Sequence, residues 1–235
     1  MFTNKIFCFG DGYAHGHVWP EWPQILQVLL PDWDIVTHTG VGAGNEFLID
    51  CLLNCEIQNQ TVIFQWANPQ RFDKLLQDTD WIQRAHKDPV YFFNFENNSS
   101  GTWWLSSASR DQKITEYHDF FVQDQQAQLR FQNQKILVEN YLQNQRCRYY
   151  FSSSTEQEHF CQQHPAAHLR GQEIQPSPVL HFHFVTDCLI PALDLPVDPT
   201  LKEKLKDLIL TTNWQSYDPD RREIWRQICE QIQGK

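Results

Sequence analysis

The sequence predicts an α/β fold, a three-layer α/β/α domain built around a parallel sheet. Within the first 65 residues, three short apolar runs each end at a glycine or a turn, and a helical pattern separates each run from the next. Strands that alternate with helices are joined by right-handed crossovers and therefore pair in parallel. The continuous apolar run Val62–Phe64 is typical of a strand covered on both faces.

The first half of the chain contains the elements on which this prediction depends. Gly10-Asp11-Gly12 indicates a tight turn after the first apolar run, and Asn45 is a candidate N-cap for the second helix. The expected elements are a strand over 5–9, a helix over 20–30, a strand over 34–38, a helix from 45 onward and a strand over 60–65.

The second half is less regular and begins with an aromatic segment. Residues 70–110 contain Trp103 and Trp104, and we expect an insertion that covers one side of the site. The elements expected after it are one long helix or two over 113–142, a strand over 148–151, a helix over 177–189, a proline-rich linker over 191–199, and amphipathic helices over 201–210 and 220–232. We divide the chain into an α/β domain over 1–195 and a C-terminal helical extension over 196–235.

Composition excludes several classes of function. A net charge of −10 opposes the electrostatic term that drives binding to nucleic acids. No apolar run approaches the roughly 18 residues that a membrane helix needs. The run Ile6–Phe9 is too short for a signal peptide, so we expect a soluble protein of the cytoplasm.

The cysteines and histidines do not indicate a metal site or a cofactor. Seven cysteines are scattered without a framework of spacings, which is typical of reduced thiols. Cys51 and Cys55 share a helix face, but no quartet of ligands accompanies them. His15 and His17 form a pair without a nearby carboxylate. We therefore expect neither a metal nor a cofactor.

Ligands of open parallel sheets bind at the carboxyl ends of the strands. In this chain the loops at that edge begin at Gly10, Gly40 and Trp66. Four sequence blocks lie in or near these loops and resemble, in order, those of the SGNH (GDSL-like) hydrolases. The blocks are Phe9–Gly16, Gly40–Asn45, Phe64–Pro69, and Gln172–Pro178 followed by His181.

Each block matches a motif of that family. Gly10-Asp11-Gly12 resembles G-D-S, and Gly40-Val41-Gly42 resembles the glycine turn after the second strand. Asn68 stands where the family has G-x-N-D, and Gln172–Ser177 resembles D-x-x-H-P-S. The resemblance covers residues 5 to about 190 and implies a flavodoxin-like parallel sheet. The stretch 66–72 and the Pro-Ser-Pro of the last block also resemble a branch found in tailed phages of marine and cyanobacterial hosts.

The resemblance implies a site from which the catalytic triad has been lost. In the family, a serine attacks an ester or amide carbonyl while a histidine, oriented by an aspartate, takes its proton. Gly12 stands at the serine position, Gln172 at the aspartate position and Gln175 at the histidine position. A glutamine amide cannot act as a base near neutral pH. Gly42, with Gly44 as second choice, and Asn68 would keep their roles in the oxyanion hole.

Other residues offer partial alternatives. A shifted alignment would make Glu173 the acid and His181 or His183 the base, although His181 matches better a second, structural histidine of the family. Candidate nucleophiles near the turn or at the end of the fourth strand are Tyr13, His15, His17 and Ser152. The equivalent of Asp11 in the family mainly holds its loop by hydrogen bonds to backbone amides, and we expect the same here.

Three functions follow as hypotheses. The first is a catalytically silent SGNH-fold module that binds an acylated carbohydrate or another small ester. The second is an active esterase or carbohydrate deacetylase with an unorthodox nucleophile. The third is a structural part of a phage particle that binds other virion proteins or itself through the C-terminal helices, which would place it in the host cytoplasm or the virion.

Overall fold

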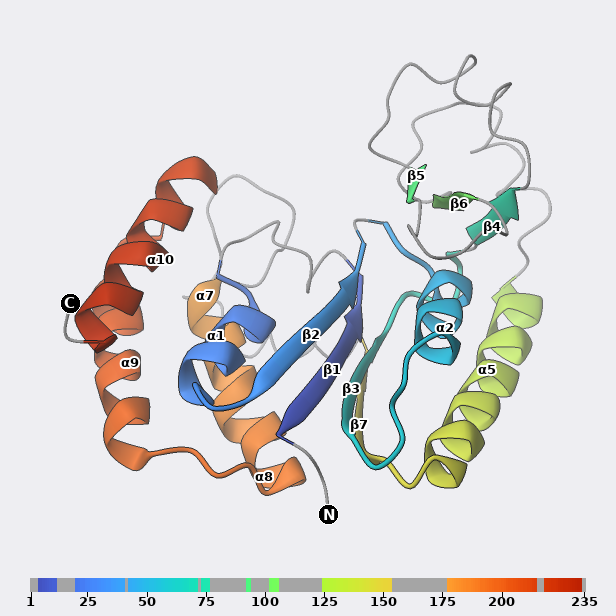
Figure 1. The fold of residues 1–235 in the computed structure, drawn as a ribbon. Helices are drawn as coiled ribbons and strands as arrows, with labels where there is room; N and C mark the ends of the chain where they lie inside the picture. The colour runs from blue at the N-terminus through green and yellow to red at the C-terminus, as the bar shows by residue number, and fades with distance from the viewer. Residues whose placement is uncertain are drawn as a thin grey trace.

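The centre of the molecule is a four-stranded parallel sheet. The computed structural model describes residues 4–11, 20–40, 42–71, 73–76, 92–93, 102–105, 124–153, 177–214 and 218–233. The strands are β1 (Lys5–Gly10), β2 (Asp34–Thr39), β3 (Thr61–Trp66) and β7 (Arg148–Ser153), and they lie in the order β2-β1-β3-β7 (Figure 1). The α/β fold predicted from the sequence is confirmed, and all four strands lie where the apolar runs predicted them.

Alternating side chains of the strands form two apolar cores, one on each face. Ile6, Cys8 and Ile63 point to the first face, whereas Phe7, Phe9 and Phe64 point to the second. All six are buried because helices cover both faces, which explains why β1 and β3 read as continuous apolar runs.

The first face is covered by α1 and by a helical segment near the C-terminus. These elements are α1 (Trp22–Leu29), α7 (Pro178–His183), the π-helical η5 (Phe184–Leu189) and α8 (Ile190–Leu193). The indole N–H of Trp22 donates to the side-chain oxygen of the buried Gln65 at 3.2 Å, which ties α1 to β3.

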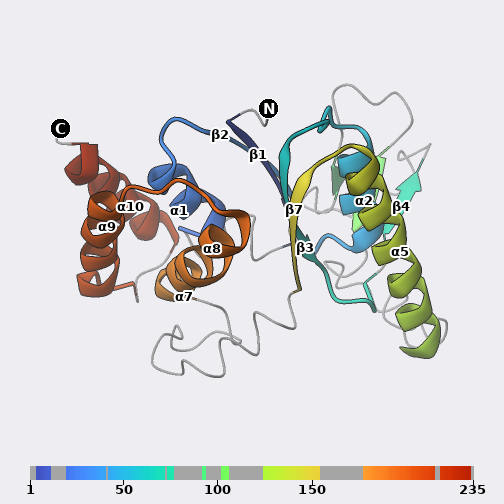
Figure 2. The same cartoon turned by 90° about the horizontal axis from the view of Figure 1, so that it is seen from below.

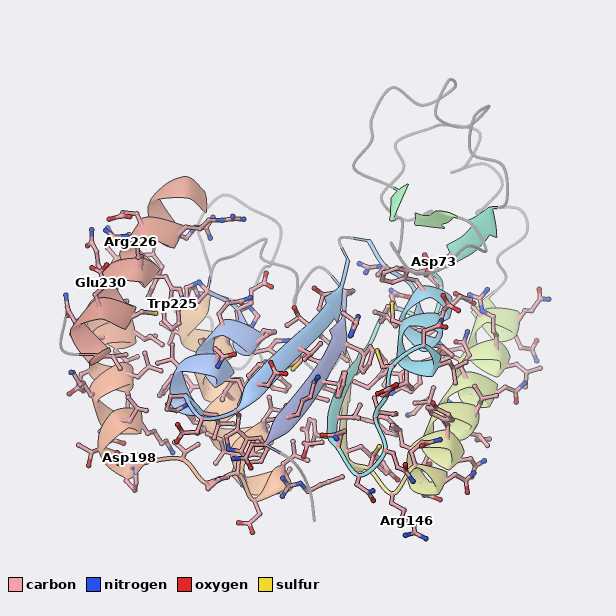
Figure 3. The ribbon with its side chains drawn as sticks, viewed as in Figure 1. Asp73, Arg146, Asp198, Trp225, Arg226 and Glu230 are labelled. Atoms are coloured by element: carbon pink, nitrogen blue, oxygen red, sulfur yellow. The ribbon has the colours of Figure 1, made fainter. Side chains whose placement is uncertain are left out.

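Two further helices lie outside this layer. They are α9 (Pro199–Thr211) and α10 (Asp218–Gln233), and both views show them beyond α1 and α7 (Figures 1 and 2). Leu205, Ile209 and Trp225 are buried in the same apolar core as α1. On the outer side of α10, Arg226 pairs with Glu223 and Glu230 (Figure 3). The C-terminal helices are therefore packed against the sheet domain.

The second face is covered by α2 (Asn45–Leu53) and α5 (Asp124–Asn144). Figure 2 shows these helices on the side of the sheet opposite α1 and α7. Val138 and Leu142 of α5 are buried against the aromatic residues of β3 and β7. Every helix in the described ranges is too short or too polar to cross a lipid bilayer.

The helix after Ser177 is longer than the sequence predicted. Residues 190–193 were expected to begin a linker at Pro191, but they continue the helix as α8. Proline lacks the N–H that an α-helix needs at an interior position. The wider i→i+5 bonding of η5 just before Pro191 changes the hydrogen-bond register, and this lets the helix continue to Leu193.

A small antiparallel sheet follows β3 in the region predicted as an insertion. It consists of β4 (Asp73–Leu76), β5 (Phe92–Phe93) and β6 (Thr102–Leu105), in the order β4-β6-β5. This sheet lies beyond the N-terminal end of α2, on the side of the carboxyl ends of the parallel strands (Figure 1).

Candidate functional site

A partly buried ion pair marks the carboxyl edge of the parallel sheet. Asp11 follows β1 and is fully buried, and its Oδ2 accepts a hydrogen bond from Nη1 of Arg71 at 2.6 Å. The same Nη1 lies 3.4 Å from the carbonyl oxygen of Ala43, at the end of the loop after β2. Loops from three neighbouring strands therefore meet at the guanidinium of Arg71.

The loop that carries Arg71 is fixed at both ends. The Asn45 side chain accepts a hydrogen bond from Ala67 N at 2.9 Å and donates to Ala67 O at 3.2 Å. Arg130 of α5 donates to the carbonyl oxygens of Pro69 and Arg71, each at 3.0 Å. These bonds hold the backbone of residues 67–71 from two sides, so Arg71 projects from a rigid support.

Asn45 itself differs from its predicted role. The N-cap of α2 is Gly44, and Asn45 is the first helical residue. Its side chain is buried and forms the clamp on Ala67 instead of capping the helix. Sequence pattern alone cannot separate these two uses of an asparagine at a helix start, because both employ the same amide.

Asn68 is exposed at the tip of this loop. Its Oδ1 accepts a hydrogen bond from Gln70 N at 2.9 Å, which forms an Asx turn. The Nδ2 group makes no hydrogen bond with any described residue. Asn68 therefore keeps a donor at the edge of the sheet, while its oxygen shapes the loop.

The guanidinium of Arg71 also keeps donors available. Its Nη1 is used by Asp11 and Ala43, whereas Nε and Nη2 have no acceptor among the described residues. The side chain is 28% exposed. The edge formed by Nε and Nη2 presents two parallel N–H groups, the geometry with which arginine binds pairs of oxygen atoms.

Gly42 has a structural reason to be glycine. Ala43 N donates to Gly40 O at 3.1 Å, and Gly42 has a φ of 75° at the third position of this four-residue turn. A type II turn requires a positive φ there, which favours glycine. The turn places Gly42 at the same edge of the sheet as Asp11.

The N-terminus of α2 is capped by a residue from the small sheet. Oδ2 of Asp73 accepts hydrogen bonds from Gly44 N at 2.7 Å and Phe47 N at 3.2 Å, and Figure 3 shows Asp73 at this end of the helix. A Cβ on Gly44 would lie 2.8 Å from Asp73 Oδ2, so a larger residue at this position would force the Asp73 carboxyl to shift. Because the N-cap residue Gly44 has no side chain, Asp73 supplies the capping oxygen instead.

The electrostatics of Asp73 follow from its burial. Burial raises the pKa of the carboxyl from 3.8 to about 7, against the hydrogen bonds from Phe47 and Gly44 and the charge of Arg71, which lower it. Glu46 raises the pKa further. Oδ1 is buried and has no hydrogen-bond partner. The carboxyl therefore titrates near neutral pH.

His181, expected as a structural histidine or a displaced base, is a residue of α7 whose side chain is buried. It is 2% exposed, its Nε2 has no hydrogen-bond partner, and burial lowers its pKa to about 3. An imidazole in this state is neutral and has no acid to orient it, so it cannot exchange protons with a ligand. This environment fits a structural role.

The other candidate groups in the described ranges are also not arranged for catalysis. His183 pairs with Asp187 at 3.1 Å on the surface of the helix. Ser152, at the end of β7, is buried, and its hydroxyl has no partner and therefore no base. No group of three His, Cys, Asp or Glu side chains suited to a metal is found in the part of the chain that the structure describes.

Several predicted positions lie outside the described residues. They are Gly12, Tyr13, His15, His17, Gln172, Glu173 and Gln175.

Neither a family model nor a curated protein or solved structure matches the chain. The chemistry of the site is therefore inferred from its own geometry. The described edge offers N–H donors from Asn68 and Arg71 beside a carboxylate that is already paired. Such an arrangement can hold oxygen atoms of a ligand. The carboxyl of Asp73, which has a pKa of about 7, is buried and is bonded through Oδ2 to the backbone amides of Gly44 and Phe47.

Sequence reasoning missed Arg71, Arg130 and Asp73. Arg71 lies in the stretch 66–72, which resembles phage proteins. Nothing in the sequence around it indicates that its side chain reaches Asp11, 60 residues earlier. The one signal in the sequence was that Arg71 and Asp73 come soon after β3. The loops that follow β3 and β1 start at the same edge of a parallel sheet.

Proposed function

We propose that the chain is a non-catalytic module with the SGNH type of α/β fold, which binds an acylated carbohydrate or another small ester at the carboxyl edge of its sheet. Two features of the fold support this. Numbered among themselves, the parallel strands lie in the order 2-1-3-4, which agrees with the flavodoxin-like order. The loops after β1, β2 and β3 meet where the resemblance places its first three blocks.

The observation that carries the proposal is the set of unused donors at this edge. Nε and Nη2 of Arg71 and Nδ2 of Asn68 belong to one short loop and have no acceptor among described residues. Donors of this kind bind carbonyl, ester and hydroxyl oxygens. Of the described carboxyl groups near this loop, Asp11 is paired with Arg71, and Asp73 is buried with its Oδ2 bonded to the start of α2.

Charge favours a neutral ligand over an anion. The positive charge of Arg71 is balanced by Asp11 at 2.6 Å, and the chain as a whole has a net charge of −10. An anion would therefore gain little from Arg71 and would be repelled by the rest of the protein. Acyl and hydroxyl oxygens bind to hydrogen-bond donors of a site that has no net charge. An ester of a sugar carries both kinds of oxygen.

The test measures binding and turnover on the same protein. Calorimetric titration with xylose tetraacetate should show binding, and Arg71→Lys should weaken it by about tenfold, because an ammonium cannot replace the two parallel N–H groups. The matched control is Arg146→Lys, since Arg146 is an exposed arginine at the opposite end of the sheet (Figure 3). Equal affinities for the two variants, or release of nitrophenol from p-nitrophenyl acetate well above a heat-killed sample, would reject the proposal.

An active hydrolase with an unorthodox nucleophile is the alternative. It requires a nucleophile and a base near the Asp11–Arg71 pair, and the buried hydroxyl of Ser152 has no such base. The alternative therefore needs a nucleophile from residues outside the described ranges. A serine-reactive phosphonate that labels one residue stoichiometrically and abolishes esterase activity would establish it.

A place in a phage particle would add self-association or binding to other virion proteins. The C-terminal helices were the expected contact, but Leu205, Ile209 and Trp225 are buried in the main core. Removing these helices would expose that core, so light scattering on the full chain is the appropriate measurement. A mass above that of one chain supports self-association, whereas a monomeric mass restricts the role to binding other proteins.

A further inference from the structure

A thiol and an imidazole are in contact on the α2 face of the sheet. Sγ of Cys55 lies 3.2 Å from Nε2 of His38. His38 belongs to the edge strand β2, and Cys55 follows α2 by two residues. Both side chains are half-buried, so a small reagent can reach them.

The imidazole is held in place by aromatic rings. The ring of His38 stacks on Phe9, with centroids 5.2 Å apart and planes 14° apart, and it lies nearly parallel to Phe7 at 6.3 Å. Stacking of this kind restricts rotation of the ring. Nε2 therefore stays directed at the thiol, which is the arrangement of a nucleophile and its base.

We propose that Cys55 is a site of covalent modification by soft carbon electrophiles, with His38 as the base that accepts the thiol proton. In the step, Sγ attacks the electrophilic carbon and forms an S–C bond while the leaving group departs with its electron pair. The proton of the thiol passes to Nε2 of His38, and solvent removes it afterwards. No oxidant or metal takes part.

Cys147 provides an internal comparison. It is also half-buried, but its thiol donates to the carbonyl oxygen of Ile57 at 3.0 Å. A backbone carbonyl cannot take up a proton near neutral pH, whereas an imidazole can. The two thiols thus have similar burial and differ in whether their partner is a base.

The surrounding charges define the resting state of the pair. Burial raises the pKa of Cys55 to about 11, although Lys5 lowers it, and burial together with Lys5 lowers the pKa of His38. The other titratable groups nearby are Cys51 and Tyr141, whose pKa values are also raised by burial, so both are neutral at pH 7. The pair therefore rests as a neutral thiol and a neutral imidazole between the two pKa values.

This resting state predicts an unusual pH dependence. A thiol that reacts only as free thiolate gains about tenfold in rate per pH unit below its pKa. A thiol assisted by a neutral imidazole reacts at a constant rate once the imidazole is deprotonated. Cys55 should follow the second behaviour between pH 7 and 8.5, and Cys147 the first.

The experiment treats the native full chain with limiting iodoacetamide and follows each cysteine by mass spectrometry from pH 6 to 8.5. Cys55 should be labelled first at pH 7, at least about tenfold faster than Cys147, with a rate that changes less than about twofold above pH 7. A rate at Cys55 that rises about tenfold per pH unit, or labelling no faster than that of Cys147, would overturn the proposal.

Two variants separate the role of His38 from simple exposure. His38→Gln keeps a polar side chain without a base and should lower the rate at Cys55 at pH 7 to that of Cys147. Cys147→Ser should leave the rate at Cys55 unchanged. An unchanged rate in folded His38→Gln contradicts the proposal, and if that variant does not fold, the pH profile of the unaltered chain decides.

Discussion

Asp73 caps a helix that precedes it in the chain: its Oδ2 accepts a 2.7 Å hydrogen bond from the backbone amide of Gly44, 29 residues earlier. This contact joins the first strand of the small antiparallel sheet to the N-terminus of α2. The same helix start holds Ala67 through Asn45, so the loop after β3 is fastened both before and after Arg71. The geometry of the proposed site therefore depends on contacts outside it.

Substituting Gly44 tests the closeness of this contact. Gly44→Ala should lower the free energy of unfolding by about 1 to 3 kcal/mol, because its Cβ would lie 2.8 Å from Asp73 Oδ2. Urea denaturation measures the loss. In an Asp73→Ala background the same change should cost much less, since the opposing oxygens are gone; equal costs in both backgrounds would show that the contact is not the cause.

Asp73 should make stability depend on pH. Its pKa in the folded state is raised to about 7 from 3.8, so the folded chain binds the proton more tightly than the unfolded chain does. The resulting stabilisation is complete below pH 3.8 and is lost as the pH rises through 7. Relative to Asp73→Asn, the unaltered protein should lose stability between pH 4 and 7, by at most roughly 4 kcal/mol. Parallel curves for the two proteins would contradict this.

His181 should have the opposite dependence. Its pKa in the folded state is lowered to about 3, so its contribution is complete above pH 6.5 and declines as the pH falls toward 3. His181→Phe should flatten this decline and leave stability at pH 7 unchanged within about 1.5 kcal/mol, because an unpaired polar atom is replaced by an apolar ring. Thermal unfolding from pH 4 to 7 measures both effects, and His183→Gln, at a half-buried position of the same helix, serves as the control.

Removal of one partner of the Asp11–Arg71 pair should have unequal effects. Asp11 is fully buried, whereas the side chain of Arg71 is 28% exposed. Arg71→Leu should therefore cost about 3 to 5 kcal/mol, since it leaves a buried carboxylate without its cation, and Asp11→Asn should cost less. Adding Asp11→Asn to Arg71→Leu should recover part of the loss in urea denaturation. A double variant no better than Arg71→Leu would show that the charge of Asp11 is not what Arg71 balances.

Local sequence patterns predicted most of the fold. The central strands β1 and β3 could be placed because each contains a short apolar run, such as Val62–Phe64, that is buried on both faces, and this pattern needs no knowledge of distant residues. The helix after Ser177 was predicted to end before Pro191, because a proline normally ends a helix. The π-helical turn that accommodates this proline has no recognisable sequence pattern.

The sequence indicated where two candidate site residues lie but not which residues they contact. The glycine of the turn at Gly42 and the donor of Asn68 could be named from their motifs, and both lie at the carboxyl edge. The partners Arg71 and Asp73 could not be assigned, because their roles depend on how the loop after β3 returns toward Asp11 and Gly44. The thiol–imidazole contact of Cys55 and His38 was hidden for the same reason, since it joins a strand to the end of the following helix.

The most direct test of the binding proposal follows the N–H groups of Arg71 and Asn68 by nuclear magnetic resonance while xylose tetraacetate is added. The arginine Nε–H signal that disappears in Arg71→Lys and the amide signal that disappears in Asn68→Ala should both shift on titration, and no acetate should be released. Shifts confined to other signals, or steady release of acetate, would contradict the proposed function.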